Sequence, residues 1–163
     1  MILVTVGSFQ FDELVEHVDS LVASGTICEE VIAQIGSGTY IPKHITYFRH
    51  RTDIEVLYDQ ARLTICHGGA ATVSALIRRG RPFVAFANSS LAHDHQADML
   101  AALDRRKWCK WCHSLDDMAE AIRWALVPQV PDTHRELSRS IARFFQEQRG
   151  ARRRGRRRIA VPS

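Results

Sequence analysis

The chain has 163 residues, of which 45% are hydrophobic and 25% are charged, as in a single globular domain that buries a core of its own. Its longest apolar run, residues 83–87, is far too short to span a membrane, and Met1 leads directly into a strand-like segment. We therefore expect no signal peptide, no transmembrane helix and a location in the cytoplasm.

The net charge of +4 is unevenly distributed. Residues 150–163 contain six arginines and no acidic residue, which leaves 16 of the 22 basic side chains against all 18 acidic ones in residues 1–149. We expect residues 150–163 to form a disordered tail. The run from Arg152 to Arg158 fits a solvated tail or a contact with an anionic membrane surface. We expect no nucleic-acid partner, because no aromatic residue interrupts the run.

In chain order, strand-like and helical patterns alternate. Strands are expected at residues 2–6, 31–35, 45–48, 63–66 and 82–86, with a weak further strand near 108–111. Helices are expected at residues 11–23, 53–61, 70–79, 95–103, 115–126 and 135–147. This alternation predicts an α/β fold, a Rossmann-like parallel sheet with helices on both faces, within residues 1–149.

The stretch from residue 63 to residue 72 carries the strongest functional signal. A strand ends at Cys66, the turn His67-Gly68-Gly69 follows, and a helix begins directly at Ala70. Glycines let the backbone approach an anion closely, and the free N–H groups and dipole of a helix N-terminus attract it. The pattern predicts a phosphate or diphosphate site, hence a nucleotide ligand, although two adjacent glycines also occur in plain tight turns.

Ligands of parallel α/β sheets bind at the carboxyl ends of the strands. This rule places four polar or glycine-rich loops along one rim, namely residues 7–8, 36–39, 67–72 and 88–96. At this rim His67 fits a phosphate contact or a packed turn residue. The two histidines that flank Asp94 fit a ligand contact or an ordinary surface loop: His93 and His95.

Four cysteines are expected to be reduced in the cytoplasm: Cys28, Cys66, Cys109 and Cys112. The last two, together with His113, have a spacing typical of metal ligands. A structural zinc site needs a fourth ligand, and the sequence contains no second pair. We therefore predict no metal site here.

Two stretches resemble a known family. Val-Thr-Val-Gly at residues 4–7, followed by Phe-Asp-Glu-Leu-Val at 11–15, is similar to the amino end of exopolysaccharide glycosyltransferase subunits of the PssE type. Cys-His-Gly-Gly-Ala-Ala-Thr at 66–72, with Gly80-x-Pro82 and Asp-His-Gln at 94–96, resembles the C-terminal domain of glycosyltransferase family 28, the MurG-like donor domain.

The resemblance covers roughly residues 1–127 and implies half of a GT-B enzyme, the domain that binds a UDP-sugar donor. It implies an inverting hexosyltransferase without metal ion or other cofactor. A separate membrane-anchored subunit would bind the acceptor, a lipid-linked saccharide in exopolysaccharide biosynthesis. The chain would then work in the cytoplasm, peripheral to the inner face of the membrane.

The resemblance also implies which residues bind the donor. The N–H groups of the 69–72 turn and the 7–8 turn would hold the diphosphate, Gln96 and Asp94 the sugar hydroxyls, and the backbone of residues 48–50 the uracil edge. We assign no catalytic residue, because the family usually keeps the catalytic base on the acceptor half. The predicted donor-binding set is Gly7, Ser8, His67, Gly68, Gly69, Ala70, Ala71, Thr72, His93, Asp94 and Gln96.

The chain departs from the family pattern at two positions. Ala71 stands where a glycine is usual, and Ala75 stands where a glutamate commonly binds the ribose hydroxyls. Alanine cannot accept those hydrogen bonds. Either donor binding is weakened, or another group holds the ribose, or catalysis is lost. The alternative to a transferase subunit is therefore a non-catalytic subunit that binds nucleotide sugar and scaffolds its partner.

Overall fold

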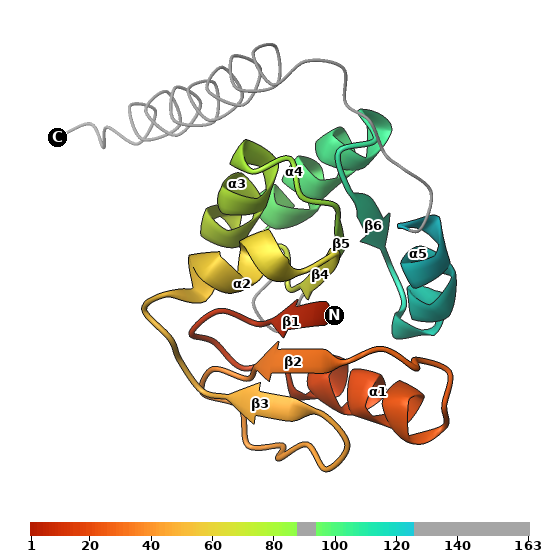
Figure 1. The fold of residues 1–163 in the computed structure, drawn as a ribbon. Helices are drawn as coiled ribbons and strands as arrows, with labels where there is room; N and C mark the ends of the chain where they lie inside the picture. The colour runs from red at the N-terminus through yellow and green to blue at the C-terminus, as the bar shows by residue number, and fades with distance from the viewer. Residues whose placement is uncertain (88–93, 126–163) are drawn as a thin grey trace, which may run out of the picture. The chain divides into compact units, whose positions relative to one another are not determined.

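The structure is a computed structural model that describes residues 1–87 and 94–125. Six parallel strands form one sheet in the order β3-β2-β1-β4-β5-β6 (Figure 1). The α/β fold predicted from the alternating pattern is confirmed. The predicted helix at residues 135–147 and the predicted arginine tail lie outside the described residues, as does most of the 88–96 loop.

The strands are β1 (Ile2–Thr5), β2 (Val31–Gln34), β3 (Thr46–Phe48), β4 (Leu63–Cys66), β5 (Phe83–Phe86) and β6 (Lys110–Cys112). The helices are α1 (Asp12–Ala23), α2 (Ile54–Gln60), α3 (Ala70–Arg78), α4 (Asp94–Arg105) and α5 (Met118–Trp124), with the 3-10 helix η1 (Leu115–Asp117) before α5. Most boundaries lie within two residues of the predicted ones. The last strand starts two residues late, because Lys107 and Trp108 still donate hydrogen bonds to the final turn of α4.

The centre of the sheet is β1, which pairs with β2 on one side and with β4 on the other. The register sets Thr5, the last residue of β1, beside both Gln34 and Cys66. Three strands therefore end at the same level. From β1 the chain adds β2 and β3 on one side of the sheet, and then β4, β5 and β6 on the other side. The strand ends where this direction reverses form the switch point at which α/β sheets bind ligands.

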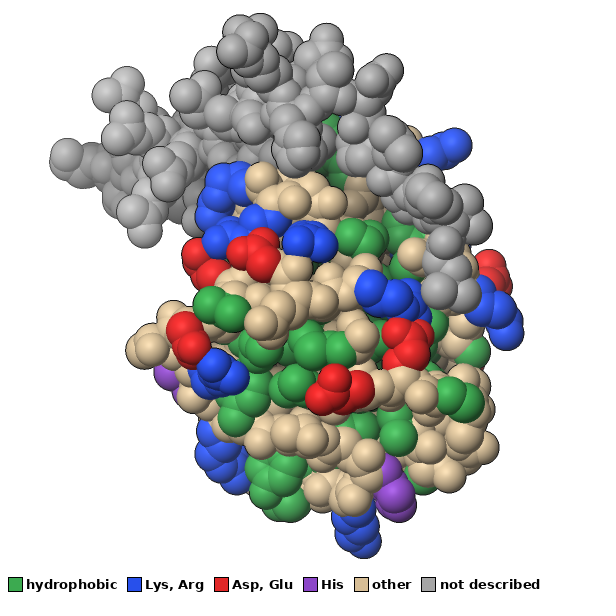
Figure 2. Space-filling view, viewed as in Figure 1, with side chains coloured by type: hydrophobic (Ala, Val, Ile, Leu, Met, Phe, Trp, Pro, Cys, Tyr) green, Lys and Arg blue, Asp and Glu red, His purple; other side chains and the backbone are tan. Residues whose placement is uncertain are grey.

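Ion pairs connect neighbouring elements at the surface. Arg79, after α3, pairs with Glu55 and Asp59 of α2, and Arg62 pairs with Glu29 across the start of β4 and the approach to β2. On the face shown in Figure 2, most acidic side chains lie beside basic ones. Exposed pairs of this kind contribute little stability each.

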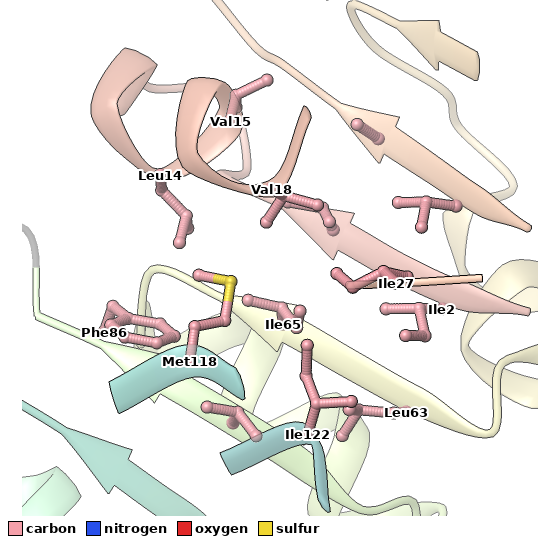
Figure 3. Close-up of a cluster of buried hydrophobic side chains, with 14 of the residues drawn as sticks. Ile2, Leu14, Val15, Val18, Ile27, Leu63, Ile65, Phe86, Met118 and Ile122 are labelled. Atoms are coloured by element: carbon pink, nitrogen blue, oxygen red, sulfur yellow. The ribbon is translucent and has the colours of Figure 1, made fainter. Parts of the chain in front are cut away.

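The core on one face of the sheet is covered by α1 and α5 (Figure 3). Its side chains come from these helices, from the segment before β2 and from alternate strand positions, such as Ile2, Leu14, Val15, Val18, Ile27, Leu63, Ile65, Phe86, Met118 and Ile122. The other alternate positions point to the opposite face, where α2, α3 and α4 lie (Figure 1). The helices in the described part of the chain are all too short or too polar to cross a lipid bilayer.

Two carboxylates of α1 hold the long connection between β2 and β3. Asp12 accepts hydrogen bonds from the backbone and hydroxyl of Thr39, and Asp19, only 2% exposed, accepts from the backbone of Lys43 and His44 and from the phenol of Tyr40. Burial alone would raise the pKa of Asp19, but these hydrogen bonds lower it below its usual value. The ionised form of Asp19 therefore stabilises the folded state.

We expect Asp19→Asn to lower the free energy of unfolding at pH 7 by about 2–4 kcal/mol, because an amide cannot accept this set of donors. The folded pKa of Asp19 is depressed, so the wild-type advantage is present above the unfolded pKa of about 4 and disappears as the pH falls below it. Chemical denaturation from pH 7 to pH 3 measures the difference. The control is Asp53→Asn at a half-exposed carboxylate. An equal loss in both variants would contradict this account of Asp19.

Candidate functional site

The turn between β4 and α3 needs both of its glycines. Gly68 has φ +72°, and a methyl group there would lie 2.7 Å from Cδ1 of Leu100 in α4. Gly69 has an ordinary extended backbone, with φ −63° and ψ 135°, but a methyl group there would lie 2.3 Å from Nε2 of His67. The sequence prediction of a strand, a glycine turn and a helix is confirmed at this place.

The imidazole of His67 packs against the glycine turn that follows it. Its Nδ1 lies 3.4 Å from the carbonyl oxygen of Thr5, which can only accept, so Nδ1 carries the proton. The side chain is 6% exposed, and burial lowers its pKa below the usual value, against the smaller opposite effect of the Thr5 hydrogen bond. His67 is therefore a neutral, packed turn residue, which was one of the two alternatives left open by the sequence.

The turn after β1 packs against the same ring. Gly7 has φ +67°, and a methyl group there would lie 3.1 Å from Cε1 of His67. On its other side a methyl group at Gly36 would lie 2.9 Å from the carbonyl oxygen of Gly7 and 2.1 Å from that of Phe9. The turns after β2, β1 and β4 therefore form one continuous rim, with Ser8 exposed beside it.

In the described part of the chain, the N-terminus of α3 has neither a side-chain cap nor a negative charge of its own. No side chain among the described residues caps it, and its first turn holds no acidic residue, whereas the first turns of α1 and α2 contain Asp12, Glu13 and Glu55. Ala70 and Ala71 are exposed there. Uncapped N–H groups and the positive end of the helix dipole attract anions.

Gln96 of α4 holds the glycine turn from the side. Its Nε2 donates a 2.6 Å hydrogen bond to the carbonyl oxygen of His67. The structure therefore brings Gln96 to the predicted rim as a residue that positions the turn. Its predicted contact with sugar hydroxyls stays a prediction.

A buried polar chain runs beneath the rim, and sequence reasoning missed it. The N–H of Gly7 donates to the hydroxyl of Thr5, and that hydroxyl donates to Oε1 of Gln34 over 3.0 Å. Nε2 of Gln34 lies 3.4 Å from Nδ1 of His50, which follows β3. The chain fixes the Gly7 turn relative to β2 and β3. Its only sequence signal is that polar residues end two otherwise apolar strands.

A sequence model described as "Glycosyltransferase family 28 C-terminal domain" matches residues 1–122. The chain belongs to this family. The match contains the whole rim described above and extends into α5, so family 28 membership rests on most of the described residues. The predicted family is confirmed, whereas the narrower PssE-type assignment stays a prediction.

Among curated family 28 relatives, the UDP-N-acetylglucosamine transferase subunit ALG13 of Mus musculus is 28% identical over 123 residues, covering 67% of this chain and 10% of the relative. The Homo sapiens subunit is 28% identical over 122 residues, covering 68% and 11%. This chain thus spans about a tenth of the length of the curated relatives it matches.

Solved structures share the fold. MurG of Acinetobacter baumannii has a TM-score of 0.62 at 20% identity, covering 77% of this chain and 40% of that chain. An NMR structure of ALG13 has a TM-score of 0.59 at 17% identity, covering 86% and 94%. At these identities the likeness concerns the fold alone.

Two positions of the predicted family 28 site are buried. Thr72, in the first turn of α3, is only 9% exposed. Ala75 is 6% exposed, and the guanidinium of Arg79, which pairs with Glu55, donates to the carbonyl oxygen of Ala75 over 3.4 Å. The missing glutamate is thus replaced by a packed methyl group.

The predicted site residues around position 94 are only partly described. Asp94 is the first residue of α4, but its side chain and the whole of His93 lie outside the described part of the chain.

In the described part of the chain, no group of three or more His, Cys, Asp or Glu side chains is arranged for a metal ion. Burial raises the pKa of the free thiols of Cys66 and Cys112 to about 12, which leaves them protonated at pH 7.

Gly69→Ala should reduce the free energy of unfolding by about 1–3 kcal/mol, because the added methyl group collides with the imidazole while the backbone itself tolerates alanine. The His67→Ala background removes the obstacle, so the same change should there cost about 0.5 kcal/mol or less. A double-mutant cycle by denaturant titration measures both. Equal costs in the two backgrounds would show that the ring is not the obstacle.

Stability should also depend on pH through His67. Its folded pKa lies below the unfolded value of about 6.5, so the unfolded state binds the proton first, and the free energy of unfolding falls as the pH drops below about 6.5. His67→Gln removes this dependence, and thermal unfolding between pH 8 and pH 5 compares the two chains. Parallel curves for wild type and variant would contradict a buried neutral His67.

Proposed function

We propose that this chain binds a UDP-sugar through the rim formed by the turns after β1 and β4, as the donor-binding half of a hexosyltransferase. The observation that carries the proposal is the uncapped N-terminus of α3 behind the Gly68–Gly69 turn. It lies inside the segment that matches family 28.

The N–H groups of Ala70, Ala71 and Thr72 are the donors available to a diphosphate at this helix end. Charge develops on the diphosphate as the sugar leaves, and fixed backbone dipoles stabilise such charge without having to reorganise. In this proposal His67 and Gln96 position the glycine turn, and Gln96 also contacts the hydroxyls of the donor sugar. The transfer is proposed to be inverting, with no metal ion in the active site.

The proposal includes a second subunit that supplies the acceptor. The curated relatives carry the word subunit in their names, and the MurG fold shared with this chain covers only 40% of MurG. We propose a membrane-attached partner with a lipid-linked saccharide acceptor, in exopolysaccharide biosynthesis. The chain would work in the cytoplasm, peripheral to the inner face of the membrane, with Arg152–Arg158 near anionic lipid.

A second candidate function is supported by position 75. Because a buried methyl group stands where the family commonly has glutamate, a non-catalytic scaffold that keeps only the diphosphate contacts is the alternative. Turnover by this chain together with its partner separates the two functions. A transferase loses turnover when the diphosphate site is blocked, whereas a scaffold leaves the partner's activity unchanged.

The proposal predicts that the purified chain binds UDP and that Ala71→Glu weakens binding about tenfold or more. A carboxylate in the first turn of α3 repels the diphosphate, while it suits the helix dipole and leaves the fold intact. Calorimetric titration with UDP, UDP-glucose, UDP-glucuronate and UDP-N-acetylglucosamine measures the affinity and names the preferred sugar.

The matched control is Gln60→Glu, the same charge change at an exposed position at the far end of α2. It should leave the affinity unchanged. The proposal fails if UDP binds neither to the wild-type chain alone nor to the chain co-purified with its partner subunit. It also fails if the Ala71→Glu variant binds UDP as tightly as the wild type.

A further inference from the structure

Positively charged side chains gather at the amino-terminal ends of the strands, opposite the rim. Because β5 and β6 are parallel, with Val84 beside Lys110, the segments that lead into them start side by side at the amino edge. Arg81 precedes β5, Arg105 ends α4, and Arg106 and Lys107 form the turn that leads toward β6 (Figure 1). We call Arg81, Arg105, Arg106, Lys107 and Lys110 the cationic edge.

The side chains of the cationic edge form no ion pair in the described part of the chain. Arg51, Arg62 and Arg79 each form an ion pair with a carboxylate. Lys43, Arg78 and Arg123 form none either, but the cationic edge brings five such cations to neighbouring segments. The nearby carboxylate of Asp104 accepts the backbone N–H of Trp111 over 3.0 Å. The cationic edge therefore lacks a negative partner in the described chain.

Backbone strain marks the centre of the cationic edge. Lys107 has φ +57°, and it is the single non-glycine residue with positive φ in the described chain. It donates to the carbonyl of Asp104 and Trp108 donates to that of Leu103, the Schellman pattern that usually has glycine at the position of Lys107. The end of α4 favours cations, which accounts for Arg105. It does not account for a lysine held in the left-handed region.

We propose that the cationic edge is a docking surface for an acidic polypeptide segment of a partner protein. The arginine forks of Arg105 and Arg106 and the lysine charges fit a row of carboxylates. Residues 126–163 do not have the composition of such a segment, because they contain ten arginines and only three acidic side chains.

Two other anionic surfaces fit less well. A bilayer contact needs apolar side chains beside the cations. The exposed large hydrophobic residues of the described chain all come between β1 and β4 in the sequence: Phe9, Ile41, Tyr47 and Val56. A nucleic acid without sequence preference needs an open aromatic platform. Trp108 is half-buried, with the guanidinium of Arg106 5.6 Å from its ring centre.

The test uses the full-length chain with its six tail arginines changed to glutamine, so that the tail cannot bind the probe. Fluorescence anisotropy measures binding of a fluorescein-labelled decamer of glutamate at low and at physiological ionic strength. Lys107→Gly should weaken binding about two- to fivefold and at the same time raise Tm, because glycine relieves the strain. The triple variant R105Q/R106Q/K107G should lose about tenfold or more.

The control is Arg51→Gln, which removes one positive charge far from the cationic edge and should leave binding unchanged. Calorimetry with UDP on each variant keeps this result separate from the proposed donor site. The proposal is overturned if the decamer does not bind, if Arg51→Gln weakens it as much as Lys107→Gly, or if the same residues bind phosphatidylglycerol vesicles or oligouridylate more tightly.

Discussion

The contact of the His67 ring with Gly7 and Gly69 is the constraint on which the rest of the rim depends. The ring joins the turns of β1 and β4, which are neighbours only in the folded sheet, and it excludes a side chain at either glycine. Gln96 and Leu100 of α4 contact the same turn, through a hydrogen bond to the carbonyl oxygen of His67 and through packing against Gly68. Because the ring is neutral and buried, the proposed diphosphate site relies on backbone N–H groups and not on a charged side chain.

Acidic side chains stand in the first turns of α1 and α2 but not in that of α3. The carboxylates of α1 bind the connection between β2 and β3, and those of α2 pair with Arg79. At the amino edge, cations collect without partners in the described residues. The proposed diphosphate site thus lies at the carboxyl ends of the strands and the cationic edge at their amino ends, so occupancy of one need not obstruct the other.

The sequence predicted the sheet, the described helices and the family, because period-two and helical patterns and the 66–72 motif are local signals. It also predicted that the loops after β1, β2 and β4 share a rim. It did not predict the roles of Thr5 and Gln34, since a polar residue ending a strand does not reveal its partner. The burial of Thr72 and the left-handed backbone of Lys107 depend on tertiary contacts, which no local pattern contains.

The most direct test is to follow the backbone amide signals of the isotope-labelled chain by NMR while UDP is added. If the turn before α3 holds the diphosphate, the largest shifts occur at Gly7 and at residues 69–72, with a smaller shift at Gln96, while Arg81 and Lys107 stay unchanged. Shifts confined to other parts of the chain would show that the turn before α3 does not hold the diphosphate.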